Sequence, residues 1–231
     1  MRIYFVMDIM DGLVVRGAGG NRKSYKPIHR ESEVLSSMNI TNSEPLTVFE
    51  AIKPRYLYIA DLDRIMGTGD NLNTIRNLGK RVEVIADMGF KSREEIKEID
   101  NPVVGTETFD IRLLEGVDTE GVTVSIDILD DLLDASGSFN SWEEMLRFLN
   151  SFRLRAVILL TLRRVGTETS PEWRLIEKAI DISDNPVFTG GGVRGMDDVE
   201  RAKEIGCEGL LVATAVHRKK IPLEIVRIGD Y

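Results

Sequence analysis

Residues 8–12 read Asp-Ile-Met-Asp-Gly, and residues 127–131 read Asp-Ile-Leu-Asp-Asp. Each copy follows a short apolar run, and the two copies lie about half a chain apart in a sequence of 231 residues. Two more pairs repeat in the same way, Met88–Ser92 with Gly191–Gly195 and Val104–Glu107 with Val212–Ala215. Self-similarity at one long spacing indicates a fold built from two copies of one half.

Eight short apolar runs follow one another along the chain, and most lack the alternation of a strand with one wet face. The runs are Ile3–Ile9, Tyr56–Ala60, Val82–Ala86, Pro102–Gly105, Val122–Ile128, Ala156–Thr161, Pro186–Thr189 and Gly209–Ala213. Stretches with helical periodicity lie between them, at Asn71–Leu78, Ser92–Ile99, Trp142–Phe152, Pro171–Ile182 and Met196–Ile205. Eight strand-and-helix units predict an α/β fold, a (β/α)8 TIM barrel made of two half-barrel repeats.

The barrel is expected to form one domain over residues 1–231. A doubly wound open sheet is the alternative architecture. Two tandem domains would also explain the repeat, but four units alone leave both edges of their sheet unpaired, so one closed barrel is favoured.

The composition is that of an ordinary globular protein, with 42% hydrophobic and 29% charged residues. A net charge of −8 repels phosphate backbones, which argues against nucleic acid as a partner. No apolar run approaches the roughly 20 residues of a membrane span, which argues against a membrane. The single cysteine, Cys207, lies in an apolar stretch and cannot form an internal disulfide, so we expect a cytoplasmic protein with Cys207 in its core.

Two carboxylates end predicted strands at equivalent places in the repeat. Asp8 ends strand one and Asp127 ends strand five, and in an eight-stranded barrel these strands face each other across the mouth. Two carboxylates in one pocket can divide acid and base roles if their surroundings separate their pKa values. The alternative is that each caps a helix or anchors a loop.

A phosphate site is expected at the ends of strands seven and eight. Gly190, Gly191 and Gly192 end strand seven, and Ala213 and Thr214 end strand eight and open a short helix. Glycines let the backbone approach an anion and point N–H groups at it, and barrels often hold phosphate at these two loops. The alternative is a plain glycine turn.

Other strand ends carry weaker signals. Thr161 can hydrogen-bond a ligand, and Arg163 can clamp an anionic group, although it can equally pair with a nearby surface glutamate. Asp61, Asp63 and Asp87 supply too few donors for a hard-cation site, so no metal is expected. The basic stretch Gly17–Pro27 is expected to be a mobile loop on the active face, with a plain surface loop as the alternative. His29 and His217 are expected to be structural or on the surface.

Three stretches resemble the family of the histidine-biosynthetic isomerase HisA and its synthase relative HisF. Val6–Gly17 resembles the first-strand signature, Tyr56–Asp63 the second strand and Gly190–Arg194 the seventh-strand phosphate loop, and the resemblance extends over essentially the whole chain. It implies an Amadori aldose-to-ketose isomerisation of a phosphoribosyl amine without a cofactor. By this resemblance, Asp8 is the general base at C2, Asp127 assists protonation or holds sugar hydroxyls, and Thr161 positions the ligand. Arg16, Asp61 and Arg163 are expected to contact the substrate.

The chain also departs from the family pattern. Asp87 stands in the third-strand phosphate loop, Val165 stands where the sixth-strand loop of the family carries an aspartate, and Ala213 replaces a glycine. These departures fit a HisA-related paralogue of a kind known mainly from archaea, acting on a small, singly phosphorylated substrate. The alternatives are a HisF-like lyase or synthase with an ammonia-delivering partner, and a barrel that binds a phosphate ligand without catalysis. A homo-oligomer is left open.

Overall fold

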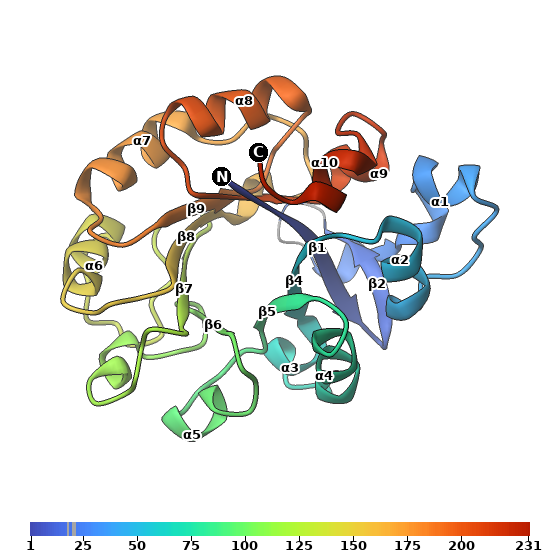
Figure 1. Ribbon diagram of the computed structural model, residues 1–231. Coiled ribbons are helices and arrows are strands. Elements are labelled where there is room, and N and C mark those ends of the chain that lie inside the picture. The colour runs from blue at the N-terminus through green and yellow to red at the C-terminus, as the bar shows by residue number, and fades with distance from the viewer. Residues whose placement is uncertain (18, 20–21) are drawn as a thin grey trace.

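Eight parallel strands close into a barrel, with the helices outside them (Figure 1). The structure is a computed structural model that describes residues 1–17, 19 and 22–231. The barrel strands are β1 (Arg2–Met10), β4 (Tyr56–Asp61), β5 (Glu83–Asp87), β6 (Pro102–Gly105), β7 (Thr123–Ile128), β8 (Ala156–Thr161), β9 (Val187–Gly190) and β10 (Gly209–Val212). Because β1 pairs with β4 on one side and with β10 on the other, the ring of eight parallel strands has no open edge, which confirms the (β/α)8 barrel.

The strands read as unbroken apolar runs because both of their faces are buried. Every residue of β4 and β7 is buried. One face of each strand fills the barrel interior, where Tyr4, Tyr58 and Phe188 pack together, and the other face packs against the helices. Cys207 is also buried, which confirms its expected place in the core, and burial raises the pKa of its thiol to about 12.

The larger helices surround the strands, as expected for repeated βα units (Figure 1). They are α2 (Pro45–Ile52), α4 (Leu72–Gly79), α6 (Trp142–Leu149), α7 (Trp173–Ile182) and α8 (Met196–Glu204). Shorter helices are α1 (Glu33–Ser37), α3 (Leu62–Met66), α5 (Arg93–Ile96), α9 (Thr214–His217) and α10 (Leu223–Ile228), and 3-10 turns cover η1 (Arg22–Ser24), η2 (Ile28–Arg30), η3 (Ile111–Leu114) and η4 (Leu162–Arg164).

An antiparallel extension of β1 was not expected from the sequence. The chain turns at Asp11 and Gly12, with φ of 52° and 71°, and returns as β2 (Leu13–Arg16), which pairs with β3 (Lys26–Pro27). Asp-Gly between two apolar segments is the usual signal of such a two-residue hairpin. The last two residues of the loop expected over Gly17–Pro27 therefore form the strand β3. Residues 18, 20 and 21 of that loop lie outside the described residues.

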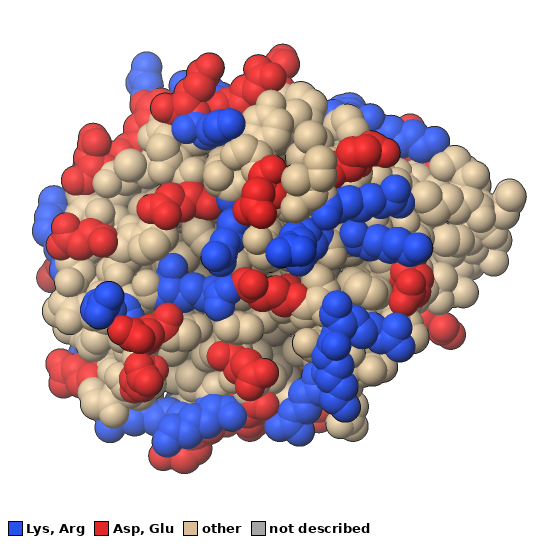
Figure 2. All heavy atoms as spheres, viewed as in Figure 1, with Lys and Arg blue, Asp and Glu red and all other residues tan. Residues whose placement is uncertain are grey.

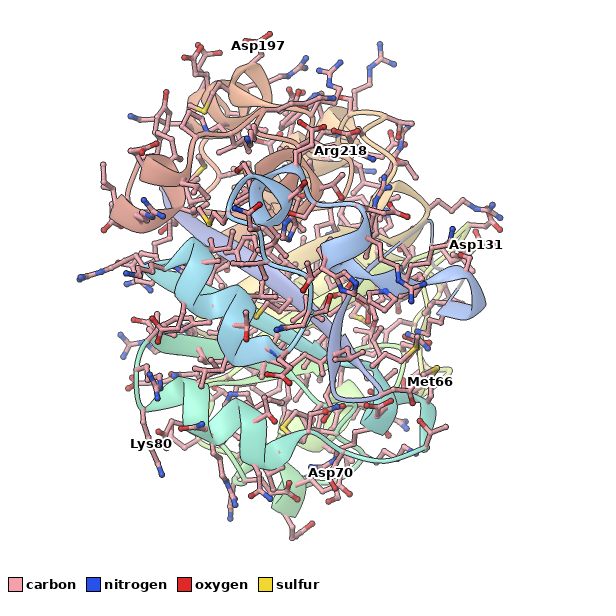
Figure 3. All side chains as sticks on the ribbon, turned by 90° about the vertical axis from the view of Figure 1, so that its right-hand side faces the viewer. Met66, Asp70, Lys80, Asp131, Asp197 and Arg218 are labelled. Carbon is pink, nitrogen blue, oxygen red and sulfur yellow. The ribbon has the colours of Figure 1, made fainter. Side chains whose placement is uncertain are left out.

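The carboxyl ends of the barrel strands share one face. In the side view, Met66 after β4 and Asp131 after β7 lie on one side of the molecule, and Lys80 before β5 lies on the other (Figure 3). Figure 2 shows the face on which both chain ends lie, where basic and acidic side chains are intermixed. Within the described ranges, no helix has the length and apolar character needed to cross a membrane.

Candidate active site

A cavity of about 220 Å³ lies at the carboxyl ends of the strands. Its walls come from strand ends on all sides of the barrel, from the β2 strand and from the loops after β8, β9 and β10. It brings together seven of the residues singled out from the sequence: Asp8, Arg16, Asp127, Gly191, Gly192, Ala213 and Thr214. This face is the usual place for the active site of such a barrel.

Asp8 lies on β1, paired with Ala60 of β4 and with Val15 of the hairpin. Burial raises the pKa of its carboxyl group to about 6, and the Arg22 guanidinium opposes that rise. A Cβ on Gly17 would lie only 2.9 Å from Asp8 Oδ2, so the missing side chain of Gly17 leaves room for this carboxylate. A carboxylate of this pKa is largely ionised at neutral pH and can act as a general base.

Asp127 lies on β7, which the ring of strands places directly opposite β1. The Ser125 hydroxyl donates to its Oδ1 at 2.7 Å, and the Glu107 amide donates to its Oδ2 at 3.3 Å. Burial outweighs these two hydrogen bonds and raises the pKa of Asp127 to about 6. The two predicted carboxylates therefore face one cavity from opposite walls, in surroundings that differ in hydrogen bonding.

Asp87 is a third carboxylate in the cavity, at the position where the sequence departs from the phosphate loop of the family. It ends β5, is 8% exposed, and accepts a hydrogen bond from the Gly89 amide at 2.9 Å. Burial, and then the charge of Asp127, raise its pKa to about 7. A Cβ on Gly105 would lie 2.9 Å from Asp87 Oδ2 and 3.0 Å from Asp127 Oδ2, so the two carboxylates flank a position without a side chain.

Arg22 brings a positive charge to these carboxylates. Its guanidinium lines the cavity and pairs with Glu107, after β6, at 2.7 Å. Its charge opposes the rise in pKa of Asp8, Asp87 and Asp127. The sequence placed Arg22 in a basic loop but could not show that it reaches across the barrel mouth.

The glycine loop after β9 has the backbone shape that only glycine adopts easily. Gly191 and Gly192 have φ of 85° and 82°, and both line the cavity together with Ala213 and Thr214. Gly190 lies within β9 and is not among the described residues that line the cavity. A Cβ added to Gly190 would lie 2.8 Å from the Cβ of Leu211, so this glycine makes room for Leu211. The loop can present backbone N–H groups to an anion, which is the arrangement expected for phosphate.

Substituting Gly192 by alanine is expected to weaken both folding and phosphate binding. The new Cβ would lie 2.7 Å from the carbonyl oxygen of Ser170, so the loop after β8 must move, in addition to the strain of a positive φ. We expect a loss of about 2–4 kcal/mol in the free energy of unfolding, measured in urea, and at least a tenfold weaker Kd for inorganic phosphate.

Gly116→Ala is the matched control for this substitution. Gly116 has a φ of 80°, but an added Cβ would meet no atom within 4 Å. The control shares the backbone strain without the collision, so it is expected to cost about 1 kcal/mol and to leave phosphate affinity unchanged. Equal losses of phosphate affinity in the two variants would contradict a direct role for the glycine loop.

Three predicted substrate contacts are not brought to the cavity. Asp61 is fully buried and accepts hydrogen bonds from the amides of Arg64 (3.2 Å) and Asn71 (2.6 Å), so it caps α3 and fixes the following loop. Arg163 is exposed and paired with Asp130. Thr161 ends β8, but it is not among the described residues that line the cavity.

Arg16 and His217 lie together at the hairpin side of the cavity. Arg16 pairs with Glu31 and donates to the carbonyl oxygen of Gly166 at 3.1 Å. His217 is buried, its Nδ1 lies 2.8 Å from the Ser32 hydroxyl, and burial followed by the Arg16 charge lowers its pKa to about 3. The expectation of a structural histidine fits this neutral, anchored ring, although the ring also lines the cavity. Among the described residues, no three His, Cys, Asp or Glu side chains form a group that could hold a metal ion.

Comparisons with known proteins agree with the geometry. An uncharacterized protein of Methanocaldococcus jannaschii is 36% identical over the full length of both chains. Two relatives named 1-(5-phosphoribosyl)-5-((5-phosphoribosylamino)methylideneamino)imidazole-4-carboxamide isomerase are more distant. The protein from Thermococcus onnurineus is 28% identical, covering 97% of this chain and 96% of its own, and that from Nitrosopumilus maritimus is 25% identical, covering 97% of each. The family described as histidine biosynthesis protein matches residues 2–222, and the chain therefore belongs to this family, which contains HisA and HisF.

Proposed function

We propose that this protein is a HisA-like isomerase that converts a singly phosphorylated aldosylamine into the corresponding aminoketose by acid–base catalysis. The observation that carries the proposal is the pair Asp8 and Asp127, whose pKa values are raised to about 6 on opposite walls of a cavity that also contains a glycine loop suited to phosphate. Family relatives named as isomerases support this class of reaction.

The proposed chemistry consists of proton transfers at C2, at C1 and at the C2 hydroxyl, and it needs no redox cofactor. After the sugar ring opens to a protonated imine, Asp8 removes the proton from C2, and the electron pair neutralises the iminium to give an enolamine. Carbon C1 then takes up a proton as the C2 hydroxyl loses one and becomes a carbonyl. Asp127 is placed to supply the proton or to hold the reacting hydroxyl, because it faces Asp8 across the cavity.

Two observations support a substrate different from that of the histidine pathway. Methanocaldococcus jannaschii has a protein named as the imidazole-carboxamide isomerase that is 23% identical over 73% of this chain, besides the uncharacterized protein that is 36% identical over all of it. The names of the isomerases specify two phosphoribosyl groups. Here Asp87 occupies the cavity wall opposite the glycine loop, and an unpaired carboxylate there disfavours a second phosphate.

The position of Val165 supports a non-catalytic alternative. Its side chain lines the cavity and cannot transfer a proton, while the nearby Glu168 is paired with Lys220 at 2.9 Å. A barrel that binds a phosphate ligand without turnover is therefore the second candidate function.

One assay separates these functions. The purified protein is incubated in D2O either with the histidine-pathway ribotide or with the aldosylamine formed from ribose 5-phosphate and ammonia, and proton NMR follows loss of the C2 proton and formation of ketose. We expect exchange and ketose from the singly phosphorylated compound at a higher kcat/KM. Faster turnover of the ribotide would contradict a changed substrate. Binding of both compounds without exchange at C2 would contradict an isomerase.

A further inference from the structure

The wall of the cavity formed by β5, β6 and β7 has an excess of negative charge. Asp87 and Asp127 form no ion pair with any described residue, and Arg22, the cation that the described lining places beside them, is already paired with Glu107. Asp8 is likewise without an ion pair in the described part of the chain and faces the same space. The carboxylates in this cavity therefore outnumber the cations that could neutralise them.

The two carboxylates of this wall approach each other over Gly105, which has no side chain to separate them. Asp87 and Asp127 come from β5 and β7, and the strand between them, β6, presents Gly105 at their level. Their Oδ2 atoms lie 2.9 and 3.0 Å from the point where a side chain of Gly105 would begin. Two carboxyl groups that approach each other at one wall of the cavity are suited to a ligand group that donates several hydrogen bonds and carries positive charge.

The hydroxyl of Tyr58 is a second, independent polar group at this wall. It is 4% exposed, it lines the cavity, and its hydroxyl has no hydrogen-bond partner among the described residues. Burial and the charges of Asp87, Asp127 and Asp8 raise its pKa well above the ordinary value, so it remains a neutral phenol. Because this hydroxyl belongs to a buried residue that lines the cavity, it is free to hydrogen-bond a polar ligand group at this wall.

The acidic wall lies across the barrel from the glycine loop. In the ring of strands, β5 is opposite β9, whose loop carries Gly191 and Gly192. We propose that the ligand carries an ammonium group at the end remote from its phosphate, and that Asp87, Asp127 and Tyr58 bind this ammonium group. This inference rests on the proposed function, because it takes the phosphate site at the glycine loop as given, and it narrows the substrate to an amino-sugar phosphate or a similar compound.

Three sugar phosphates of the same framework test the inference by calorimetry at neutral pH. D-Glucosamine 6-phosphate carries the ammonium group, D-glucose 6-phosphate carries a hydroxyl in its place, and N-acetyl-D-glucosamine 6-phosphate carries an uncharged amide. We expect the wild-type protein to bind the first at least about tenfold more tightly than the other two, as charge-assisted hydrogen bonds to buried carboxylates would require.

Two variants assign this selectivity to the acidic wall. Asp87→Asn keeps an oxygen that can accept from the Gly89 amide, so the fold is retained, but it removes the charge. It should reduce the preference for glucosamine 6-phosphate to less than about threefold and leave glucose 6-phosphate bound as tightly as before or more tightly. Tyr58→Phe should reduce the preference in part. Asp130→Asn, which changes an exposed carboxylate paired with Arg163, should leave it unchanged.

The failure of this inference can be distinguished from failure of the proposed function. Equal Kd values of the wild-type protein for glucosamine 6-phosphate and glucose 6-phosphate would overturn the ammonium site and leave the phosphate site standing. A preference for glucosamine 6-phosphate that persists in Asp87→Asn would also overturn the assignment. If none of the three sugar phosphates and no inorganic phosphate binds, the phosphate site and the inference built on it both fall.

Discussion

Asp8→Asn is expected to reduce kcat for the proposed isomerisation by about a thousandfold, with KM changed little. A positioned general base typically contributes a factor of about 10² to 10⁴, and asparagine keeps the size of the side chain without its basicity. The substitution also removes a buried group whose pKa is raised by burial, so folding should not be impaired. The measurement is the initial rate of ketose formation from the aldosylamine of ribose 5-phosphate, with circular dichroism as the test of folding.

Asp130→Asn provides the matched control, because Asp130 is exposed on the loop after β7 and pairs with Arg163 outside the cavity. It should retain the wild-type rate. If Asp8→Asn also turned over at close to the wild-type rate, the proton at C2 would have to leave by another route and Asp8 would lose its assigned role. A loss of ligand binding together with folding in Asp8→Asn would point instead to a structural role.

The protein is expected to be more stable at pH 5 than at pH 8, and Asp87→Asn should remove much of the difference. The pKa of Asp87 is raised from 3.8 to about 7, so the folded state binds this proton more tightly than the unfolded state. The resulting cost to stability is absent below about pH 4, grows as pH rises and is complete above about pH 7. A tenfold change in proton affinity corresponds to about 1.4 kcal/mol, so the cost is on the order of 2–4 kcal/mol.

Thermal unfolding at the two pH values checks this expectation. Asp87→Asn should raise Tm by roughly 4–8 °C at pH 8 and by much less at pH 5, where the wild-type carboxyl group is already protonated. Asp8 and Asp127 act in the same direction, so part of the pH dependence should remain in the variant. A Tm shift of equal size at both pH values, or a variant less stable than the wild type at pH 8, would show that Asp87 carries no buried-charge cost.

The barrel could be predicted because its strands are buried on both sides. The apolar run at residues 156–161 has the same bounds as β8. A parallel strand that helices cover on the outside and side chains cover on the inside is apolar on both faces. The hairpin differs from the irregular loop predicted over Gly17–Pro27 at β3, Lys26–Pro27, although Asp11 and Gly12 carry the hairpin signal.

The same burial explains why some site residues could not be predicted. Side chains alternate between the two faces of a strand, and only one face points into the barrel. In β4, Tyr58 and Ala60 point inward, so Asp61, one residue later, points toward the helices and caps α3. In β8, Leu160 lines the cavity and Thr161 faces away from it. When both faces are apolar, the sequence contains no pattern that shows which residues face the centre.

The inward position of Asp87 follows from the same alternation once the structure places one other residue of β5. Ile85 packs in the barrel interior, and Asp87 lies two residues later on the same face of β5. The contact of Arg22 with Glu107 was not open to prediction, because 85 residues separate them and their approach depends on the path of the segment after β2 across the mouth. Local pattern can assign a residue to a face, whereas the meeting of two loops is a property of the folded chain.

If the two halves of this barrel contributed identical residues to the pocket, an elongated ligand could bind in either of two orientations. The two sides of the cavity differ in their residues. One side presents Asp87 and Asp127, and the other presents Gly191 and Gly192. Under the proposed function, a ligand with a phosphate at one end and an ammonium group at the other would bind in one direction only, and the same carbon atom would always face Asp8. The two ends of the pocket therefore differ in chemistry.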